Sequence, residues 1–213
     1  MTSPFESGGL AQLFATPVFT FALRSPADLL ARVEARLREV RAGDRRPGAL
    51  SRPGLWQSPG DLHRDPAFAE VHAAVQAGAE ACLKLLALDC TLAVSELWGN
   101  ISSARDALHE HTHPNNYLSG ILYVRMPEGA GATIFQDPRP QARVLRPTVV
   151  RDNPLNSTEF ALNGRAGTLV LFPAWLTHEV RPSETDAERI TVAFNLMVRG
   201  RLGSPGLLAS SEV

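Results

Sequence analysis

The sequence has few cysteines and no excess of charge of either sign. Of its 213 residues, 2 are cysteine, 21 are basic and 22 are acidic. Cys82 and Cys90 fall in or just after an apolar helical stretch, where a reduced, buried thiol is the common outcome. We therefore expect a reducing, cytoplasmic location. The balanced charge provides no basic surface for nucleic acid or for an anionic membrane, so neither is expected as a partner.

Long apolar runs are also missing from the sequence. No stretch approaches the length of a membrane span, and the first residues lack the basic region and apolar run of a signal peptide. With 44% hydrophobic residues, the chain can nevertheless bury a full core. We expect one domain over residues 1–213. It would consist of a helical support (1–90), a core of strands (91–200) and a loose tail (201–213).

Two segments in the first half of the chain have the pattern of amphipathic helices. The first is expected from Ser25 to Gly43, and the second from Asp65 to about Asp89. Each opens with a capping residue followed by proline, and apolar residues then recur at helical spacing. The segment between them, residues 43–60, is rich in Arg, Pro and Gly and is expected to be a loop.

From residue 91 onward the apolar pattern changes to the period of two that is typical of strands. Clusters of Pro, Gly, Asn and Asp separate the apolar runs. The expected strands cover residues 91–101, 108–113, 117–126, 132–136, 158–162, 168–173, 176–181 and 188–199. Two helices followed by many short strands predict an α+β, mainly β fold. The natural arrangement is a cupin-like jelly roll, or double-stranded β-helix, with the N-terminal helices packed on its major sheet.

Four of the six histidines fall in two short segments, LHEHTHP and FPAWLTHEV. In an extended strand His109, His111 and His113 would all point to the same face. An HxH pair alone is a weak signal, because such clusters are also found on solvated polar edges. His178 strengthens the metal interpretation, since it follows a strongly apolar strand and a jelly roll brings distant residues together at its mouth.

The last expected strand, ERITVAFNLMVR, has two different faces. Arg189, Thr191 and Asn195 share the face that should look into the barrel, whereas the apolar residues from Ile190 to Val198 share the face available to the helices. A buried guanidinium without a carboxylate partner is costly. Arg189 therefore predicts either an internal acid or an anionic cosubstrate.

Several motifs in a common order resemble the 2-oxoglutarate and Fe(II)-dependent oxygenases of bacteria and phage. They are LFATPVF, WGN, HTHPNNYLSGILYV, TIFQDPR, GTLVLFPAWLTHEVRP and ERITVAFN, so the resemblance extends to about residue 200. It implies a dioxygenase that converts 2-oxoglutarate to succinate and CO2 while it oxidises a substrate. It also implies that His111, His113 and His178 bind Fe(II). Arg189, which follows His178 by 189 − 178 = 11 positions, and Thr191 would then hold the far carboxylate of 2-oxoglutarate.

One position departs from the usual pattern of these oxygenases. Most of them use two histidines and one carboxylate, whereas His113 stands here at the position of the acid. Three-histidine sites also occur in dioxygenases that use no keto acid, and three histidines can hold zinc. A three-histidine metal enzyme without 2-oxoglutarate and a non-catalytic metal-binding jelly-roll module therefore remain alternatives. Arg189 favours 2-oxoglutarate.

The composition of the site also has alternatives. His109 could pair with His111 and leave His113 to support the ligands, or Glu110 or Asp137 could complete the site. His109 and Asp137 could also act as supporting residues without binding the metal. We rank His111 and His113 first because the resemblance aligns there. Further candidates are Tyr123, as a partner of the 2-oxoglutarate carboxylate, and Asn100, Asn195 and Tyr117, as supporting residues. Trp98 and Trp175 are assigned to packing.

The substrate, a small molecule or a peptide, is not readable from the sequence. The loops that would select it, near residues 43–60 and 137–157, carry no recognisable motif. The oligomeric state is not readable either, although exposed strand edges would allow a homodimer.

Overall fold

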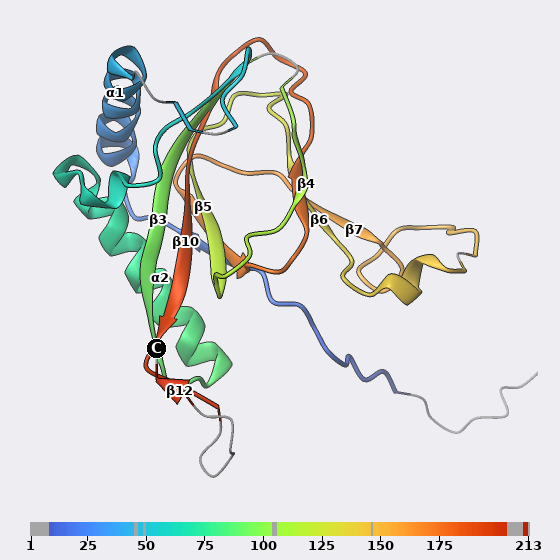
Figure 1. Cartoon of the computed structure of the whole chain (residues 1–213). Helices are drawn as coiled ribbons and strands as arrows, with labels where there is room; N and C mark the ends of the chain where they lie inside the picture. Colours follow the sequence, from blue (N-terminus) through green and yellow to red (C-terminus); the bar gives the residue numbers. More distant parts are fainter. Residues whose placement is uncertain are drawn as a thin grey trace, which may run out of the picture.

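Two antiparallel sheets face each other across the core of the molecule (Figure 1). The computed structural model describes residues 9–44, 47–48, 50–103, 106–145, 147–203 and 211–212. The larger sheet consists of β1 (Phe19–Ala22), β2 (Leu55–Gln57), β3 (Thr91–Ser102), β5 (Leu118–Arg125), β8 (Thr168–Pro173) and β10 (Arg189–Arg199), in the order β1-β8-β5-β10-β3-β2. The smaller sheet consists of β4 (Leu108–His111), β6 (Thr133–Gln136), β7 (Glu159–Leu162) and β9 (His178–Val180), in the order β4-β9-β6-β7.

The strands from β3 to β10 pass back and forth between the two sheets. β3, β5, β8 and β10 lie in the larger sheet, and β4, β6, β7 and β9 lie in the smaller one. This interleaving is the arrangement of a double-stranded β-helix, which brings segments far apart in the sequence to the same end of the barrel. The predicted fold is therefore confirmed.

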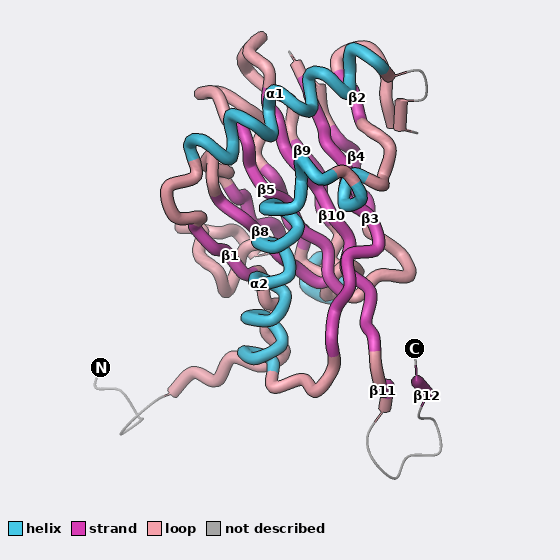
Figure 2. Tube along the Cα trace, turned by 90° about the vertical axis from the view of Figure 1, so that its left-hand side faces the viewer, coloured by secondary structure: helices cyan, strands magenta, loops and turns pink. Residues whose placement is uncertain are grey.

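Two helices cover the outer face of the larger sheet, α1 (Ala27–Gly43) and α2 (Ala69–Leu86) (Figure 2). Leu37 of α1 and Val75 of α2 pack with Phe194 of β10 in the principal hydrophobic cluster. A Cβ atom on Gly99 would lie 2.2 Å from Leu37 Cδ2, so α1 approaches β3 where that strand has no side chain. The prediction that the helices cover the apolar face of the last strand is confirmed.

The expected helix boundaries are largely right, with one exception at the start of α1. Ser25 does not cap this helix: Pro26 precedes its first residue, no side chain caps it, and Ser25 has φ +44°. Asp65 does cap, because its side chain accepts a hydrogen bond from Ala67 N (2.9 Å) at a 3-10 turn, Pro66–Phe68, that leads into α2. Neither helix is long and apolar enough to cross a membrane within the described part of the chain.

All eight expected strands are present, with ends within two residues of the prediction. The sequence did not predict β1, nor β2, which lies in the segment expected to be a loop. It also missed β11 (Arg201–Leu202) and β12 (Ser211–Glu212), which pair with each other. The tail was expected to be loose. Residues 204–210 and 213 of the tail lie outside the described residues.

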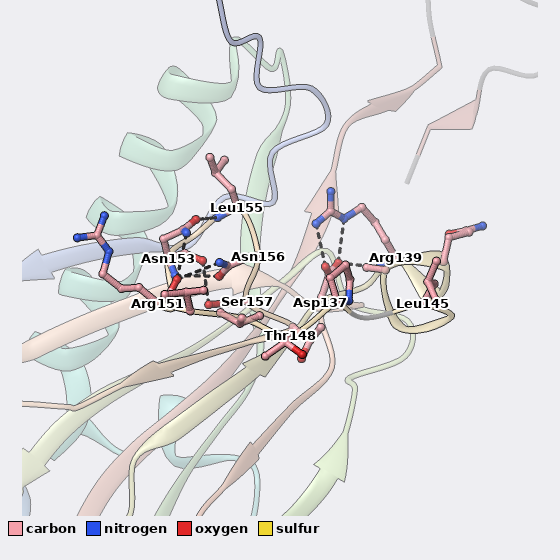
Figure 3. Close-up of a pocket in the computed structure, with 15 residues that line it drawn as sticks. Asp137, Arg139, Leu145, Thr148, Arg151, Asn153, Leu155, Asn156 and Ser157 are labelled. Carbon is pink, nitrogen blue, oxygen red and sulfur yellow. Dashed lines mark hydrogen bonds and ion pairs between the residues drawn. The ribbon is translucent and has the colours of Figure 1, made fainter. Parts of the chain in front are cut away.

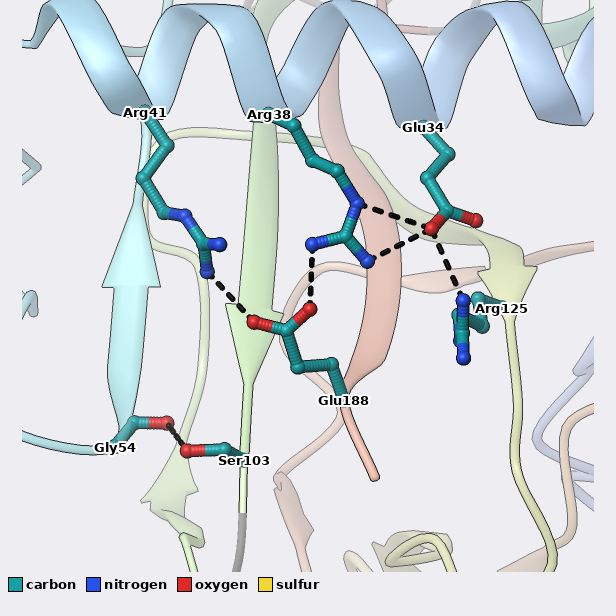
Figure 4. Close-up of polar contacts among 7 residues, drawn as sticks. All are labelled: Glu34, Arg38, Arg41, Gly54, Ser103, Arg125 and Glu188. Carbon is teal, nitrogen blue, oxygen red and sulfur yellow. Dashed lines mark hydrogen bonds and ion pairs between the residues drawn. The ribbon is translucent and has the colours of Figure 1, made fainter. Parts of the chain in front are cut away.

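An ion-pair network holds α1 over the start of β10 (Figure 4). The carboxylate of Glu188, the residue before β10, binds Arg38 (2.5 Å) and Arg41 (2.8 Å). The carboxylate of Glu34 binds Arg38 (2.7 Å) and Arg125 of β5 (3.2 Å). The network therefore joins α1 to the start of β10 and to the end of β5.

Candidate metal centre

Three of the histidines meet at one end of the barrel. His111, His113 and His178 each offer a ring nitrogen, and these three nitrogen atoms all lie within 4.8 Å of one another. The ring centroids are 4.3 Å apart for His111 and His178, 5.1 Å for His111 and His113, and 5.2 Å for His113 and His178. It is the only such group of metal-binding side chains among the described residues.

The backbone around these histidines determines where each ring lies. His111 of β4 stands directly opposite His178 of β9 in the smaller sheet. His113 lies just beyond β4, where its N–H donates to the carbonyl of Ala174 (2.9 Å) in the turn between β8 and β9. The segment 108–113 does not continue as a regular strand, because its register shifts between Leu108 and His111.

The hydrogen bonds of two rings leave the opposite nitrogen free for a metal. His111 Nδ1 lies 2.7 Å from the carbonyl oxygen of His109, and His178 Nδ1 lies 2.9 Å from that of Leu176. A carbonyl oxygen only accepts, so Nδ1 carries the hydrogen in both rings and Nε2 has a lone pair. This is the arrangement that metal-bound histidines use to fix the tautomer and the orientation of the ring.

His178, which is buried, and His113, which is half-buried, are held in their neutral form. Burial lowers the pKa of His178 to about 3, with smaller contributions from His111 and His113 that are partly offset by the bond to Leu176. Burial and the proximity of His111 lower the pKa of His113 to about 4. A metal ligand must be unprotonated, so these rings meet that condition at neutral pH.

A buried polar group lies at the other end of the barrel interior. Arg189, at the start of β10, is almost fully buried, and its Cζ lies 5.6 Å from the centre of the Tyr123 ring. Its Nε and Nη2 have no hydrogen-bond partner among the described residues. Burial lowers the pKa of the guanidinium, opposed by Tyr123.

Two hydroxyl groups stand close to this guanidinium in the sheet. Thr191 pairs with Tyr123 across β10 and β5, and the Tyr123 hydroxyl lies 2.8 Å from Thr133 Oγ1. Asn100 Nδ2 donates to Thr191 Oγ1 at 3.5 Å, a long hydrogen bond. The inner end of the barrel therefore presents unpaired N–H groups and hydroxyls, which is a suitable environment for a carboxylate.

Comparisons with known proteins agree with this geometry. Residues 96–195 match the family described as "Putative 2OG-Fe(II) oxygenase". The chain carries a 2-oxoglutarate/Fe(II) oxygenase domain. The matched segment contains all three histidines together with Arg189 and Thr191. Iron and 2-oxoglutarate are therefore the cofactors of this oxidoreductase. The resemblance to 2-oxoglutarate and Fe(II)-dependent oxygenases, inferred from the sequence motifs, is confirmed. No curated protein sequence matches the chain.

Solved structures share the fold of the oxygenase domain at low sequence identity. The epimerase SnoN from nogalamycin biosynthesis is 13% identical, with a TM-score of 0.65 over 91% of this chain and 83% of that one. A Pseudomonas putida prolyl-4-hydroxylase is 19% identical, with a TM-score of 0.61 over 87% and 94%. HygX from Streptomyces hygroscopicus, solved with nickel and 2-oxoglutarate bound, is 13% identical, with a TM-score of 0.62 over 85% and 83%.

The side chains of four other candidate residues do not join the group of three histidines. His109 and Glu110 are exposed and do not join the histidine group. The carboxylate of Asp137 binds the backbone and side chain of Arg139 (2.8 to 3.0 Å), as expected for a residue that caps a turn. Tyr117 is partly exposed, and burial of part of its ring raises its pKa.

The two tryptophans assigned to packing lie in different surroundings. Trp98, on the barrel face of β3, has its ring 5.8 Å from that of His113, so it packs beside the metal centre. Trp175, in the turn before His178, is 56% exposed. The packing assignment is therefore wrong for Trp175, because the turn carries this side chain out of the core.

Sequence reasoning missed one polar chain at the mouth of the oxygenase domain. Ser119 Oγ donates to Asn195 Oδ1 (2.7 Å), and Asn195 Nδ2 donates to Glu96 Oε2 (2.8 Å). Asn195 was a candidate for supporting the metal, but its described partners are Ser119 and Glu96. The available signal was a shift in the apolar alternation between residues 94 and 97, which marks an extra residue in β3.

A separate hollow lies in the long connection between β6 and β7 (Figure 3). Its volume is about 1030 Å³, and it is lined by residues between Asp137 and Thr158. Asn153, Asn156 and Ser157 fold the far side of this connection by hydrogen bonds to nearby backbone groups. None of the three histidines lines the hollow, so it is distinct from the metal centre.

Proposed function

We propose that His111, His113 and His178 hold Fe(II), and that Arg189, Thr191 and Tyr123 hold the far carboxylate of 2-oxoglutarate. In this proposal the domain oxidises a C–H bond of a small molecule or peptide. One observation carries it: a buried guanidinium, whose Nε and Nη2 find no partner among the described residues, lies inside a barrel that also brings three histidines together.

The unpartnered guanidinium is a specific argument for an anionic cosubstrate. Burying an uncompensated charge costs several kcal/mol, and Arg189 Nε and Nη2 find no partner among the described residues. A carboxylate can accept two parallel hydrogen bonds from these two atoms, which lie on one edge of the guanidinium. 2-Oxoglutarate supplies such a carboxylate at one end and a chelating keto acid at the other.

The histidine set leaves room for the chelating end of the cosubstrate. His111, His113 and His178 would be the only protein ligands among the described residues, so the metal could also bind a keto acid and dioxygen. When bound, iron and 2-oxoglutarate supply the activation of dioxygen, and 2-oxoglutarate is converted to succinate and CO2. Phe172 and Phe135, whose rings lie 4.7 and 6.1 Å from that of His178, exclude water from the inner side of the metal centre.

The experiment is anaerobic titration of 2-oxoglutarate into Fe(II)-loaded protein, followed by the near-visible charge-transfer band. We expect the band in the wild type, its loss in His178→Ala, and a far higher 2-oxoglutarate requirement in Arg189→Ala. Arg199→Ala is the matched control, because Arg199 is an exposed arginine on the same strand. If the wild type bound iron but gave no band and bound no 2-oxoglutarate, the domain would be a three-histidine enzyme without a keto acid or a binding module.

We also propose a cytoplasmic location and a homodimer. The location is supported by Cys82 and Cys90, which are both free thiols. The dimer is supported by β7, an edge strand of the smaller sheet whose first three residues are exposed. Light scattering on the purified protein would decide the oligomeric state, and a monomer at all concentrations would contradict the dimer.

A further inference from the structure

Strand β3 contains one extra residue opposite the outer half of β10. Asn195 pairs with Glu96, but the next residue, Leu196, pairs with Val94, so Ser95 has no partner of its own. An extra residue in one strand of a pair is a β-bulge, and bulges next to active sites redirect side chains.

The bulge turns two consecutive side chains of β3 toward the barrel. Leu92 and Val94 pack in the cluster beneath the helices, and so does Leu97. In a regular strand Val94 and Leu97 would lie on opposite faces, but here they lie on the same face. The two residues between them, Ser95 and Glu96, therefore both lie on the other face. This face is the one that looks toward the metal centre.

Buried polar groups hold the Glu96 carboxylate in place. Asn195 and Ser119, which are 2% and 1% exposed, form the chain of hydrogen bonds that ends at Glu96 Oε2, while Glu96 itself is exposed. The bulged Ser95 donates to Asn116 Oδ1 (2.7 Å) in the loop that follows His113. An exposed glutamate normally moves freely, so this one is unusually well oriented.

Glu96 and Arg189 lie far apart along the larger sheet, with Trp98 between them. Along β10, Arg189 lies four residues from Ala193, which pairs with Trp98, and six residues from Asn195, which pairs with Glu96. At about 3.3 Å per residue, Arg189 and Glu96 are therefore about 20 Å apart along the sheet. The Trp98 ring, beside His113, stands between them. Glu96 is thus at the outer end, where a substrate approaches the metal.

The chemistry of this position is specific. Asn195 is the only described hydrogen-bond partner of Glu96, and no described Lys, Arg or His forms an ion pair with it. On the same face of β3, two residues along, Trp98 offers an aromatic ring. A carboxylate beside a tryptophan ring matches a cationic nitrogen, which gains both an ion pair and a cation–π contact.

We propose that Glu96 recognises a cationic nitrogen, an amine or a guanidinium, on the substrate that is oxidised at the metal centre. Asn195 and Ser119 act as positioning residues for this carboxylate. The inference rests on the proposed function for the reaction, and it adds the class of substrate. It also predicts that Glu96 has no part in holding iron or 2-oxoglutarate.

The test compares a charged probe with a neutral one. Butylamine and N-butylacetamide are titrated into anaerobic protein loaded with Fe(II) and 2-oxoglutarate, and the shift of the charge-transfer band is followed. The same probes are titrated by calorimetry into metal-free protein, which needs no band. The variants are Glu96→Gln and Asn195→Ala. Glu80→Gln on the exposed face of α2 is the matched control.

We expect the wild type to prefer butylamine by about tenfold, the usual difference for one charge-assisted hydrogen bond. Glu96→Gln should lose this preference, Asn195→Ala should reduce it, and Glu80→Gln should retain it. Iron and 2-oxoglutarate affinities should stay within about twofold of the wild type in Glu96→Gln.

Two results would overturn the proposal for Glu96. One is an equal response of the wild type to both probes, or a preference that survives in Glu96→Gln. The other is a loss of iron or 2-oxoglutarate binding in Glu96→Gln, which would mean that the carboxylate serves the metal centre. Absence of any band in the wild type would contradict the proposed function instead, and calorimetry would still decide the role of Glu96.

Discussion

The two sheets of this molecule differ in what they contribute. The larger sheet contains two long paired strands, β3 of 12 residues and β10 of 11 residues, and two helices bury its outer face (Figure 2). The smaller sheet has strands of three or four residues, and β7 is mostly exposed. Yet β4 and β9 of the smaller sheet each carry one of the three histidines. The larger sheet therefore provides most of the buried core and carries Arg189, whereas two of the three histidines that meet lie in the smaller sheet.

The largest effect on activity should come from the smaller sheet. His178→Ala removes the most buried histidine of the metal centre. We expect at least a thousandfold loss of 2-oxoglutarate turnover and loss of iron binding, because two ligands remain. The melting temperature of the metal-free protein should change by only a few degrees. Metal analysis and calorimetry measure both effects, and retained iron would show that His178 is not a ligand.

The largest effect on stability should come from the larger sheet. Phe194→Ala on β10 empties a fully buried position between the sheet and the helices. We expect a loss of about 3–5 kcal/mol in the free energy of unfolding. Phe160→Ala on β7 is the matched control, because Phe160 is 57% exposed, and we expect it to cost less than about 1 kcal/mol. Similar losses of unfolding free energy for Phe194→Ala and Phe160→Ala, measured by urea unfolding, would contradict the view that the larger sheet contributes more to stability.

Arg189→Met should separate cosubstrate binding from folding within the larger sheet. We expect about a hundredfold weaker 2-oxoglutarate binding, roughly 2.7 kcal/mol, because a charge-assisted bidentate contact is lost. The cosubstrate-free protein should be no less stable, since Arg189 Nε and Nη2 lack described partners and a well-packed apolar residue can replace a buried charge. A marked loss of stability would mean that the guanidinium has a structural role.

Acid should destabilise the metal-free protein through His113 and His178, which lie at and beside the smaller sheet. The folded-state pKa values of His113 and His178 are about 4 and about 3, below the ordinary value of 6.5. The unfolded chain therefore binds more protons as the pH falls below 6.5, so stability present above that pH is lost toward pH 3–4. The slope for the metal-free protein should approach about 2.7 kcal/mol per pH unit for two sites. His178→Ala should halve it, and an unchanged slope would contradict the assignment.

The smallest effect should come from the ion pairs between α1 and β10. Glu188→Gln weakens the contacts with Arg38 and Arg41, which are partly exposed. We expect a loss of about 0.5–1 kcal/mol in the free energy of unfolding, reduced further by added salt. Salt-independent destabilisation in denaturant titrations would show that the network contributes through packing instead.

The sequence predicted the strands and the three histidines that meet in the structure because both rest on local patterns. Apolar alternation marks a buried strand face wherever it occurs, and it located eight strands from residue 91 onward. The short strands β1 and β2, of four and three residues, have too few positions to show alternation. Ser25 looked like a helix cap, but it has a positive φ and Pro26 takes the N-cap position, so the helix begins one residue later than a serine cap requires.

The sequence by itself determined the fold class, the likeness to 2-oxoglutarate oxygenases and the residue types of the site. Only the tertiary structure decided which residues meet. It brought His113 rather than His109 together with His111 and His178, paired Asp137 with Arg139, and oriented Glu96 through a bulge. The physical reason is that periodicity describes one strand at a time, whereas a site forms between strands. A one-residue shift in strand pairing changes which face a side chain occupies. The pattern of a single strand does not show which residue of the neighbouring strand it pairs with.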